Sequence, residues 1–137
     1  MNQYGLEIRP LGQEIGQASA IKMCYAALTK GLPELCAELL TAAETLGVSA
    51  DLAEEFELSQ TALYQRMQKG LPSLPSKSSR WIGEMEEIAQ TFDSVAVTSD
   101  FHTGAAWTFR EVAAADISPP LPMDDAIEQI ATPKISR

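Results

Sequence analysis

A long helix-forming stretch at residues 14–46 constrains the fold of this chain more than any other feature. Ala, Leu and Glu dominate it, and its one interruption lies at Gly31-Leu32-Pro33. Pro33 lacks a backbone N–H, so we expect a kink there, or a break followed by a restart of the helix. Helix-forming segments also dominate the rest of the chain. We therefore predict an all-α fold, a helical bundle.

Glycines and prolines divide the remaining sequence into shorter helical segments. We predict helices at about 49–69 with a bend near Leu58-Ser59, about 77–92, about 100–115 and about 124–131. Gly47 is a natural helix stop, and two prolines within residues 70–76 predict a loop. The connections are short, so neighbouring helices should often pack antiparallel.

One segment does not fit a helical pattern. Residues 4–11, YGLEIRPL, alternate between apolar and polar side chains, as a half-buried strand does. A strand needs a partner for its backbone groups, and no later segment offers one. Either this segment is extended coil, or its sheet lies in a missing part or in another subunit. We divide the chain into a strand-like leader (1–13), a helical domain (14–115) and a proline-containing tail with a short helix (116–137).

Composition excludes several classes of function. Ten basic and nineteen acidic side chains give a net charge of −9, which argues against binding to nucleic acid or to an anionic membrane. No apolar run approaches the roughly 18 residues of a membrane span, and no signal peptide is evident. Two cysteines, Cys24 and Cys36, suit a reducing cytoplasm, where we expect the protein to be located.

Glycine, histidine and cysteine spacing exclude further sites. No two of the eight glycines are separated by a single residue, so the chain has no G-x-G of a dinucleotide site. With one histidine and no C-x-x-C, we expect no metal site.

The stretch from Ile15 to Thr29 is where we expect chemistry, because Lys22 is its only charged residue. A helix that is apolar on most sides is usually buried on most sides, so Lys22 either reaches out to water or faces a cleft. On a helix, Ser19, Lys22 and Tyr25 share one face. A partly buried lysine has a pKa below about 10 and can accept the proton of a substrate hydroxyl. The alternative is a lysine that lies along the helix with its amine in water.

Residues 16–31, which read GQASAIKMCYAALTKG, resemble the first helix of the C-terminal domain of dehydrogenases related to 6-phosphogluconate and β-hydroxyacid dehydrogenases. That pattern is a run of glycine and small residues, a catalytic lysine, and an asparagine four residues later. Lys22 matches the lysine and Gly16 the leading glycine. The similarity extends over about residues 5–115. It points to the branch in which such a domain is attached to NAD-binding phosphogluconate-dehydrogenase-like proteins.

The resemblance implies an all-helical domain that follows a Rossmann domain. The Rossmann domain, absent from this chain and supplied in cis or in trans, would bind most of the NAD(P) cofactor. The helical domain would provide Lys22 as the catalytic residue, part of the pocket for a small-molecule substrate, and the contact of a homodimer. Ser19, Tyr25 and His102 would line that pocket. Residues 4–12 would be the end of the Rossmann domain.

Two positions depart from the family pattern. The asparagine is replaced by Ala26, and a lysine that faces the cofactor falls near Glu84, where a carboxylate would repel a phosphate. The sequence therefore supports two hypotheses. One is the C-terminal domain of an NAD(P)-dependent oxidoreductase acting on a hydroxy acid or related alcohol, inactive without its Rossmann domain. The other is a stand-alone helical dimerisation or interaction module without catalysis.

Overall fold

The computed structural model describes residues 15–132, and within this range the protein is all-α, as predicted. The predicted strand at 4–11 and the leader that contains it lie outside the described residues. The elements are α1 (Ile15–Leu46), α2 (Ser49–Ser59), α3 (Thr61–Gly70), the short 3₁₀ helix η1 (Leu71–Ser73), α4 (Leu74–Ser94), α5 (Asp100–Ala114) and α6 (Met123–Ala131).

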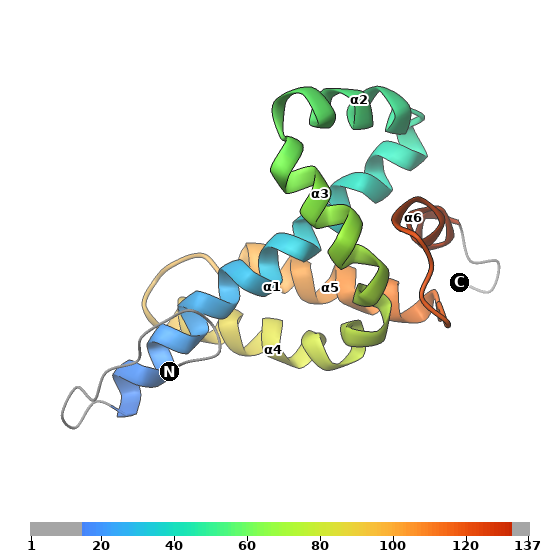
Figure 1. Ribbon diagram of the computed structural model, residues 1–137. Coiled ribbons are helices and arrows are strands. Elements are labelled where there is room, and N and C mark those ends of the chain that lie inside the picture. Colours follow the sequence, from blue (N-terminus) through green and yellow to red (C-terminus); the bar gives the residue numbers. More distant parts are fainter. Residues whose placement is uncertain (1–14, 133–137) are drawn as a thin grey trace.

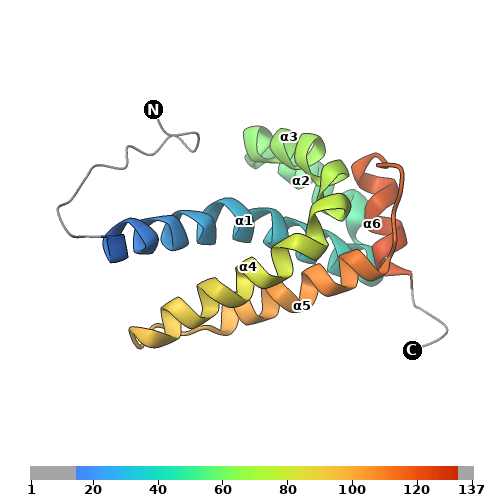
Figure 2. The ribbon, with the colours of Figure 1, turned by 90° about the horizontal axis from the view of Figure 1, so that it is seen from below.

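The helices are arranged around α1, which runs the length of the molecule (Figure 1). The α4–α5 pair is antiparallel and packs along one side of α1 (Figures 1 and 2). The α2–α3 pair turns back over α1 from its C-terminal end, and α6 packs beside that end. The predicted antiparallel packing across short connections is therefore found for α4 and α5.

The predicted break at Gly31-Leu32-Pro33 does not occur, because α1 continues through Pro33 as a single helix. Pro33 removes only one hydrogen bond, and the helix formers on both sides keep the rest of the ladder. Gly31 has a packing role instead of a terminating one. A Cβ at Gly31 would lie 3.3 Å from Phe101 Cε1 and 3.4 Å from His102 Nε2, so the glycine allows α5 to approach α1 closely.

The predicted helix at 49–69 is two helices, which is a correction to the predicted bend. The backbone of Gln60 leaves the helical region, at φ −136° and ψ 45°, and its N–H still donates to Phe56 O at 2.8 Å. The change of direction brings the ring of Phe56 to 5.6 Å from that of Tyr64. An aromatic contact across the corner therefore accompanies the break.

The predicted loop at 70–76 is mostly helical. After η1, α4 begins at Leu74, three residues earlier than expected, with Pro75 in its first turn. A proline is tolerated there because the first turn has no helical partner for its N–H. The helices α5 and α6 occupy the segments that the sequence predicts, and Gly47 ends α1 with a φ of +76°.

The core lies where α4 and α5 meet α1. Met85, Ile88 and Phe109 have no exposed surface, and Trp81 packs against Phe109 edge to face at 5.7 Å. The first half of α1 contributes only partly buried residues to the edge of this core, Met23, Ala26 and Ala27. It diverges from the α4–α5 pair (Figure 2) and Leu28 is 63% exposed, so the expectation that its neutral surface would be buried is wrong within the described residues.

A buried carboxyl group also lies between α1 and α5. Glu34 is 1% exposed, and neither of its side-chain oxygens has a hydrogen-bond partner among the described residues. Burial raises the pKa of Glu34 from 4.5 to about 8, and the neighbouring Glu38 carboxylate adds to the rise, while Thr108 opposes it. At neutral pH the Glu34 side chain is therefore mostly a neutral carboxylic acid.

The close approach at Gly31 predicts a strong response to added volume. Gly31→Leu should lower the free energy of unfolding by about 1–3 kcal/mol, because the new side chain overlaps the two aromatic rings of α5. Gly83, inside α4, has open space at its Cβ position. Gly83→Leu should leave the stability unchanged or raise it by up to about 1 kcal/mol. Urea unfolding followed by circular dichroism measures both variants, and equal stabilities would contradict the predicted contact.

The pKa of Glu34 predicts a stability that falls with rising pH. The folded state holds this proton more tightly than the unfolded state between pH 4.5 and about 8, so stability is lost across that window and is flat above it. Glu34→Gln removes this part of the slope, and the expected difference reaches at most about 5 kcal/mol. Thermal unfolding at pH 5, 6.5 and 8 measures it, with Glu54→Gln as the exposed control. An unchanged slope in Glu34→Gln would contradict the prediction.

Candidate functional site

A small cleft lies beside the first half of α1, against α4. Its volume is about 240 Å³. It is lined by Lys22, Met23, Tyr25, Ala26, Thr29, Lys30 and Glu84. The structure thus brings the predicted catalytic residue and one predicted substrate contact into one cleft. The same cleft holds both positions at which the sequence departs from the dehydrogenase pattern.

Helical spacing explains why these side chains converge. Lys22, Ala26 and Thr29 lie three and four residues apart on α1, and Tyr25 lies one position before Ala26. The side chain of Lys22 is exposed, whereas that of Tyr25 is partly buried. The described helices therefore do not bury Lys22 in the way that the sequence predicts.

The wall opposite Lys22 carries an ion pair. Lys30 Nζ bonds to Glu84 Oε1 across α1 and α4, and it lies 5.5 Å from the ring centre of Trp81. The pair fixes a carboxylate at the position where the family pattern has a lysine facing the cofactor. A carboxylate does not suit a dinucleotide phosphate, and the lysine beside it is already paired. The part of this cleft beside Glu84 therefore does not suit a phosphate of NAD(P).

The other two predicted substrate contacts lie elsewhere. Ser19 is exposed on α1 and does not line the cleft. His102 is 6% exposed between α1 and α5, and its Nε2 lies 3.4 Å from Ala27 O. The rings of Phe92 and Phe101 pack against it, and its Nδ1 is buried without a hydrogen-bond partner in the described part of the chain. The structure therefore places His102 on a different face of α1 from Lys22.

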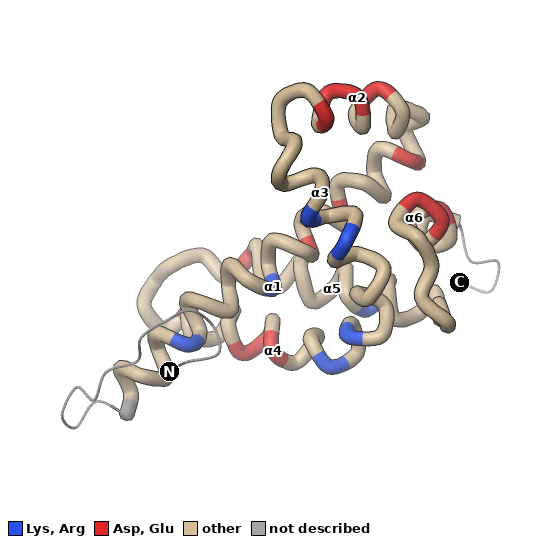
Figure 3. Tube along the Cα trace, viewed as in Figure 1, with Lys and Arg blue, Asp and Glu red and all other residues tan. Residues whose placement is uncertain are grey.

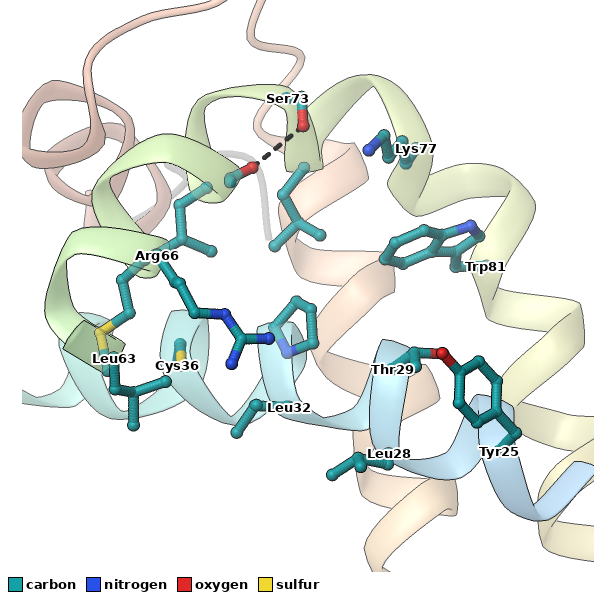
Figure 4. A pocket seen from close by; sticks show the side chains of 15 residues that line it. Tyr25, Leu28, Thr29, Leu32, Cys36, Leu63, Arg66, Ser73, Lys77 and Trp81 are labelled. Carbon is teal, nitrogen blue, oxygen red and sulfur yellow. Dashed lines mark hydrogen bonds between the residues drawn. The ribbon is translucent and has the colours of Figure 1, made fainter. Parts of the chain in front are cut away.

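A second, larger cavity adjoins the cleft and shares Tyr25 and Thr29 with it (Figure 4). It is a groove of about 490 Å³ between α1, α3, η1 and α4. Arg66 and Lys77 supply its charged side chains, and Trp81 lines it near the shared residues. Cys36 also lines it, and burial raises the pKa of this thiol while Arg66 opposes the rise.

Sequence reasoning missed Arg66 as a site residue. Lys77 attracts attention in the sequence as part of a basic cluster, but Arg66 comes from the helix before the η1 turn. The reversal of direction between α3 and α4 brings the two together. The sequence feature that could have pointed to Arg66 is the lack of any acidic residue between Glu57 and Glu84.

No cluster of three or more His, Cys, Asp or Glu side chains within 15–132 is arranged to hold a metal ion. Among the helices in that range, none combines the length and apolar character that a membrane crossing requires.

Comparison with known proteins identifies one family. A family described as a domain of unknown function (DUF1932) matches residues 43–112, which is just over half of the chain. The match includes α2 to α4, most of α5 and the end of α1, and thus Arg66, Lys77 and Glu84. Lys22 and Tyr25 lie before it. No curated protein and no solved structure gives a significant match.

Proposed function

The chain belongs to the DUF1932 family, and from that premise we propose that it is the C-terminal domain of an NAD(P)-dependent oxidoreductase. In this proposal it binds a small hydroxy acid or related alcohol and forms the dimer contact. Domains of this family occur in the C-terminal helical region of 3-hydroxyisobutyrate dehydrogenase-like proteins, which supports the proposal. The observation that carries it is the cleft in which Lys22 and Tyr25 lie together.

Lys22 acts in this proposal as the proton acceptor. Oxidation of an alcohol carbon requires its hydroxyl proton to leave, and a neutral amine within hydrogen-bond reach can take it. Tyr25 and Thr29, which line the same cleft, offer hydroxyl groups that can orient the substrate oxygen. Ala26 offers no such group, so Tyr25 takes over the orienting role of the family asparagine.

In this proposal a second domain covers the cleft, and Lys22 can then act as the proton acceptor. Lys22 is exposed in the described helices. A domain packed over the first half of α1 would exclude water from the cleft around it. The same domain would hold the cofactor, since the cleft beside Glu84 does not fit a dinucleotide phosphate. We propose a Rossmann domain, in cis or in trans, as that cover.

This proposal predicts that the chain alone binds neither NADH nor NADPH at micromolar concentrations. A titration of nicotinamide fluorescence with the purified chain measures this, because binding in an apolar site enhances the emission. Saturable binding in the micromolar range would contradict the assignment of the cofactor to another domain.

The decisive test adds the missing domain. Sequencing the DNA next to the coding region should reveal a segment that encodes a strand followed by G-x-G-x-x-G.

In the protein that contains both domains, Lys22→Met should lower kcat for hydroxy acid oxidation about a hundred- to ten-thousand-fold, because the proton acceptor is lost. Lys69→Met, an exposed lysine on α3, is the control and should retain full activity. Equal activity of the two variants would overturn the role of Lys22.

A second candidate function is a dimerisation or interaction module without catalysis. Large apolar side chains exposed on α1 and α5 favour it: Leu28 is 63%, Leu35 38%, Phe101 46% and Trp107 60% exposed. Large apolar side chains gain free energy when a partner removes them from water. The absence of activity with a Rossmann domain present would favour this candidate over the first.

Both candidates predict a homodimer. Light scattering at micromolar concentration should give twice the chain mass of 14.8 kDa. Leu28→Asp should shift the protein toward the monomer, because a charge in a buried interface is costly. Leu58→Asp is the control, since Leu58 is 78% exposed on α2, away from α1 and α5. A wild-type monomer would contradict the prediction.

A further inference from the structure

Basic residues are concentrated in one segment of this acidic protein. The net charge is −9, yet no Asp or Glu occurs between Glu57 and Glu84. That segment carries four basic side chains: Arg66, Lys69, Lys77 and Arg80. They lie on α3 and α4, whereas the acidic residues gather on α2, on α6 and farther along α4 (Figure 3). This segment is thus basic within an acidic protein.

Two of these basic residues line the 490 Å³ groove, from different walls. Arg66 comes from α3 and Lys77 from α4. In Figure 4 the guanidinium group of Arg66 extends into the groove, and Lys77 lies on the opposite wall beside Trp81, with Nζ 5.6 Å from its ring centre. No acidic side chain lines the groove. Two positive charges therefore converge on one cavity without a local counter-charge.

Neither charge is paired with a carboxylate within the described part of the protein. The ion pairs in residues 15–132 join Lys30 to Glu84 and Arg110 to Glu86. Arg66 and Lys77 take part in neither. A guanidinium group that faces an open cavity presents several N–H donors in a fork that matches a carboxylate or a phosphate. The donors of Arg66 are thus available to an anionic group.

The remaining surface of the groove is largely apolar. It is formed by Leu28, Leu32, Pro33, Leu63, Met67, Leu71 and Leu74, together with the ring of Trp81. Its volume falls in the range of about 300–1,000 Å³ that is typical of sites for small molecules. A hydrophilic anion such as free phosphate would leave this surface in contact with water. An apolar body would cover it and contribute hydrophobic free energy.

We propose that this groove is a binding site for a small organic anion with an apolar body. Its carboxylate or phosphate group lies at the guanidinium group of Arg66, its apolar body lies along α1 toward Trp81, and Lys77 adds a positive charge on the opposite wall. This proposal does not depend on the function proposed for Lys22, although Tyr25 and Thr29 border both cavities. It would hold equally in an oxidoreductase and in a module without catalysis.

Trp81 offers a direct readout of ligand binding in the full chain. Trp107→Phe removes the other tryptophan, which is 60% exposed on α5, and leaves Trp81 as the single reporter. The probes are octanoate, octyl phosphate and the neutral control octanol, which share one apolar chain. Both anions should change the Trp81 emission saturably, and octanol should bind at least about tenfold more weakly. The stronger of the two anions identifies whether the site prefers a carboxylate or a phosphate.

Charge variants separate the site from general electrostatics. Arg66→Gln and Lys77→Gln should each raise the Kd of the preferred anion about tenfold or more, and leave that of octanol unchanged. Arg80→Gln removes the same charge from an exposed position outside the groove and should leave both unchanged. Circular dichroism checks that each variant is folded. Arg66 is exposed, so Arg66→Gln leaves no buried charge without a partner and should not unfold the protein.

Three results would overturn the proposal: equal affinity for octanol and the anions, equal effects of Arg66→Gln and Arg80→Gln, or no saturable change up to about 1 mM anion. Lys22→Met distinguishes this proposal from the proposed function. It should leave anion binding in the groove unchanged, so failure of the catalytic role and failure of the anion site give different results.

Discussion

Packing against α1 is the constraint on which the rest of the structure depends. Each of the other five α-helices contacts it, and no other helix is so placed. Its second half supplies buried residues of the core, among them Cys36, Ala37 and Leu40. A single long helix can organise five others only if it stays continuous. For this reason the passage of α1 through Pro33 determines where every later helix can dock.

The two halves of α1 serve different purposes as a result. The second half supplies most of the buried residues of α1, whereas the first half meets α4 and α5 through partly buried side chains and leaves Leu28 exposed. Both cavities lie at the transition between the halves, around Tyr25 and Thr29. The small cleft faces the exposed end and the groove faces the enclosed end. A partner that covered the first half of α1 would therefore close one cavity and leave the other accessible from α3.

The sequence predicted the all-α class and most helices, but not the close contacts. Helix propensity and glycine or proline punctuation are local properties, so α5, α6 and the stop at Gly47 followed from them directly. The continuity of α1 at Pro33 did not follow from local properties, because it depends on what packs against α1. Gly31 was interpreted as a helix breaker, although it accommodates the ring of His102. The division at Gln60 was missed for a similar reason. A polar residue with no helix-breaking chemistry leaves the helix where Phe56 and Tyr64 meet.

The candidate site was predictable to the extent that it lies on one helix. Lys22 and Tyr25 come together because helical spacing alone places them so. The position of His102 depends on how α5 is oriented on α1, and that of Arg66 depends on the reversal of direction between α3 and α4. Helical spacing along one segment therefore says nothing of where either side chain lies.

Net charge proves an incomplete guide to what this protein binds. The value of −9 excludes broad attraction to polyanions, but it averages over regions of opposite sign. Asp and Glu side chains gather on α2 and α6, and Glu34, buried against α5, is mostly neutral at pH 7 because burial raises its pKa to about 8. Arg66 and Lys77 therefore line a groove that contains no acidic side chain. At distances beyond the Debye length of about 8 Å the acidic surface is screened by salt, and a small anion in the groove experiences mainly the two nearby cations. An acidic protein can in this way select a small anion while it repels an extended one, since only the small anion fits within the basic region.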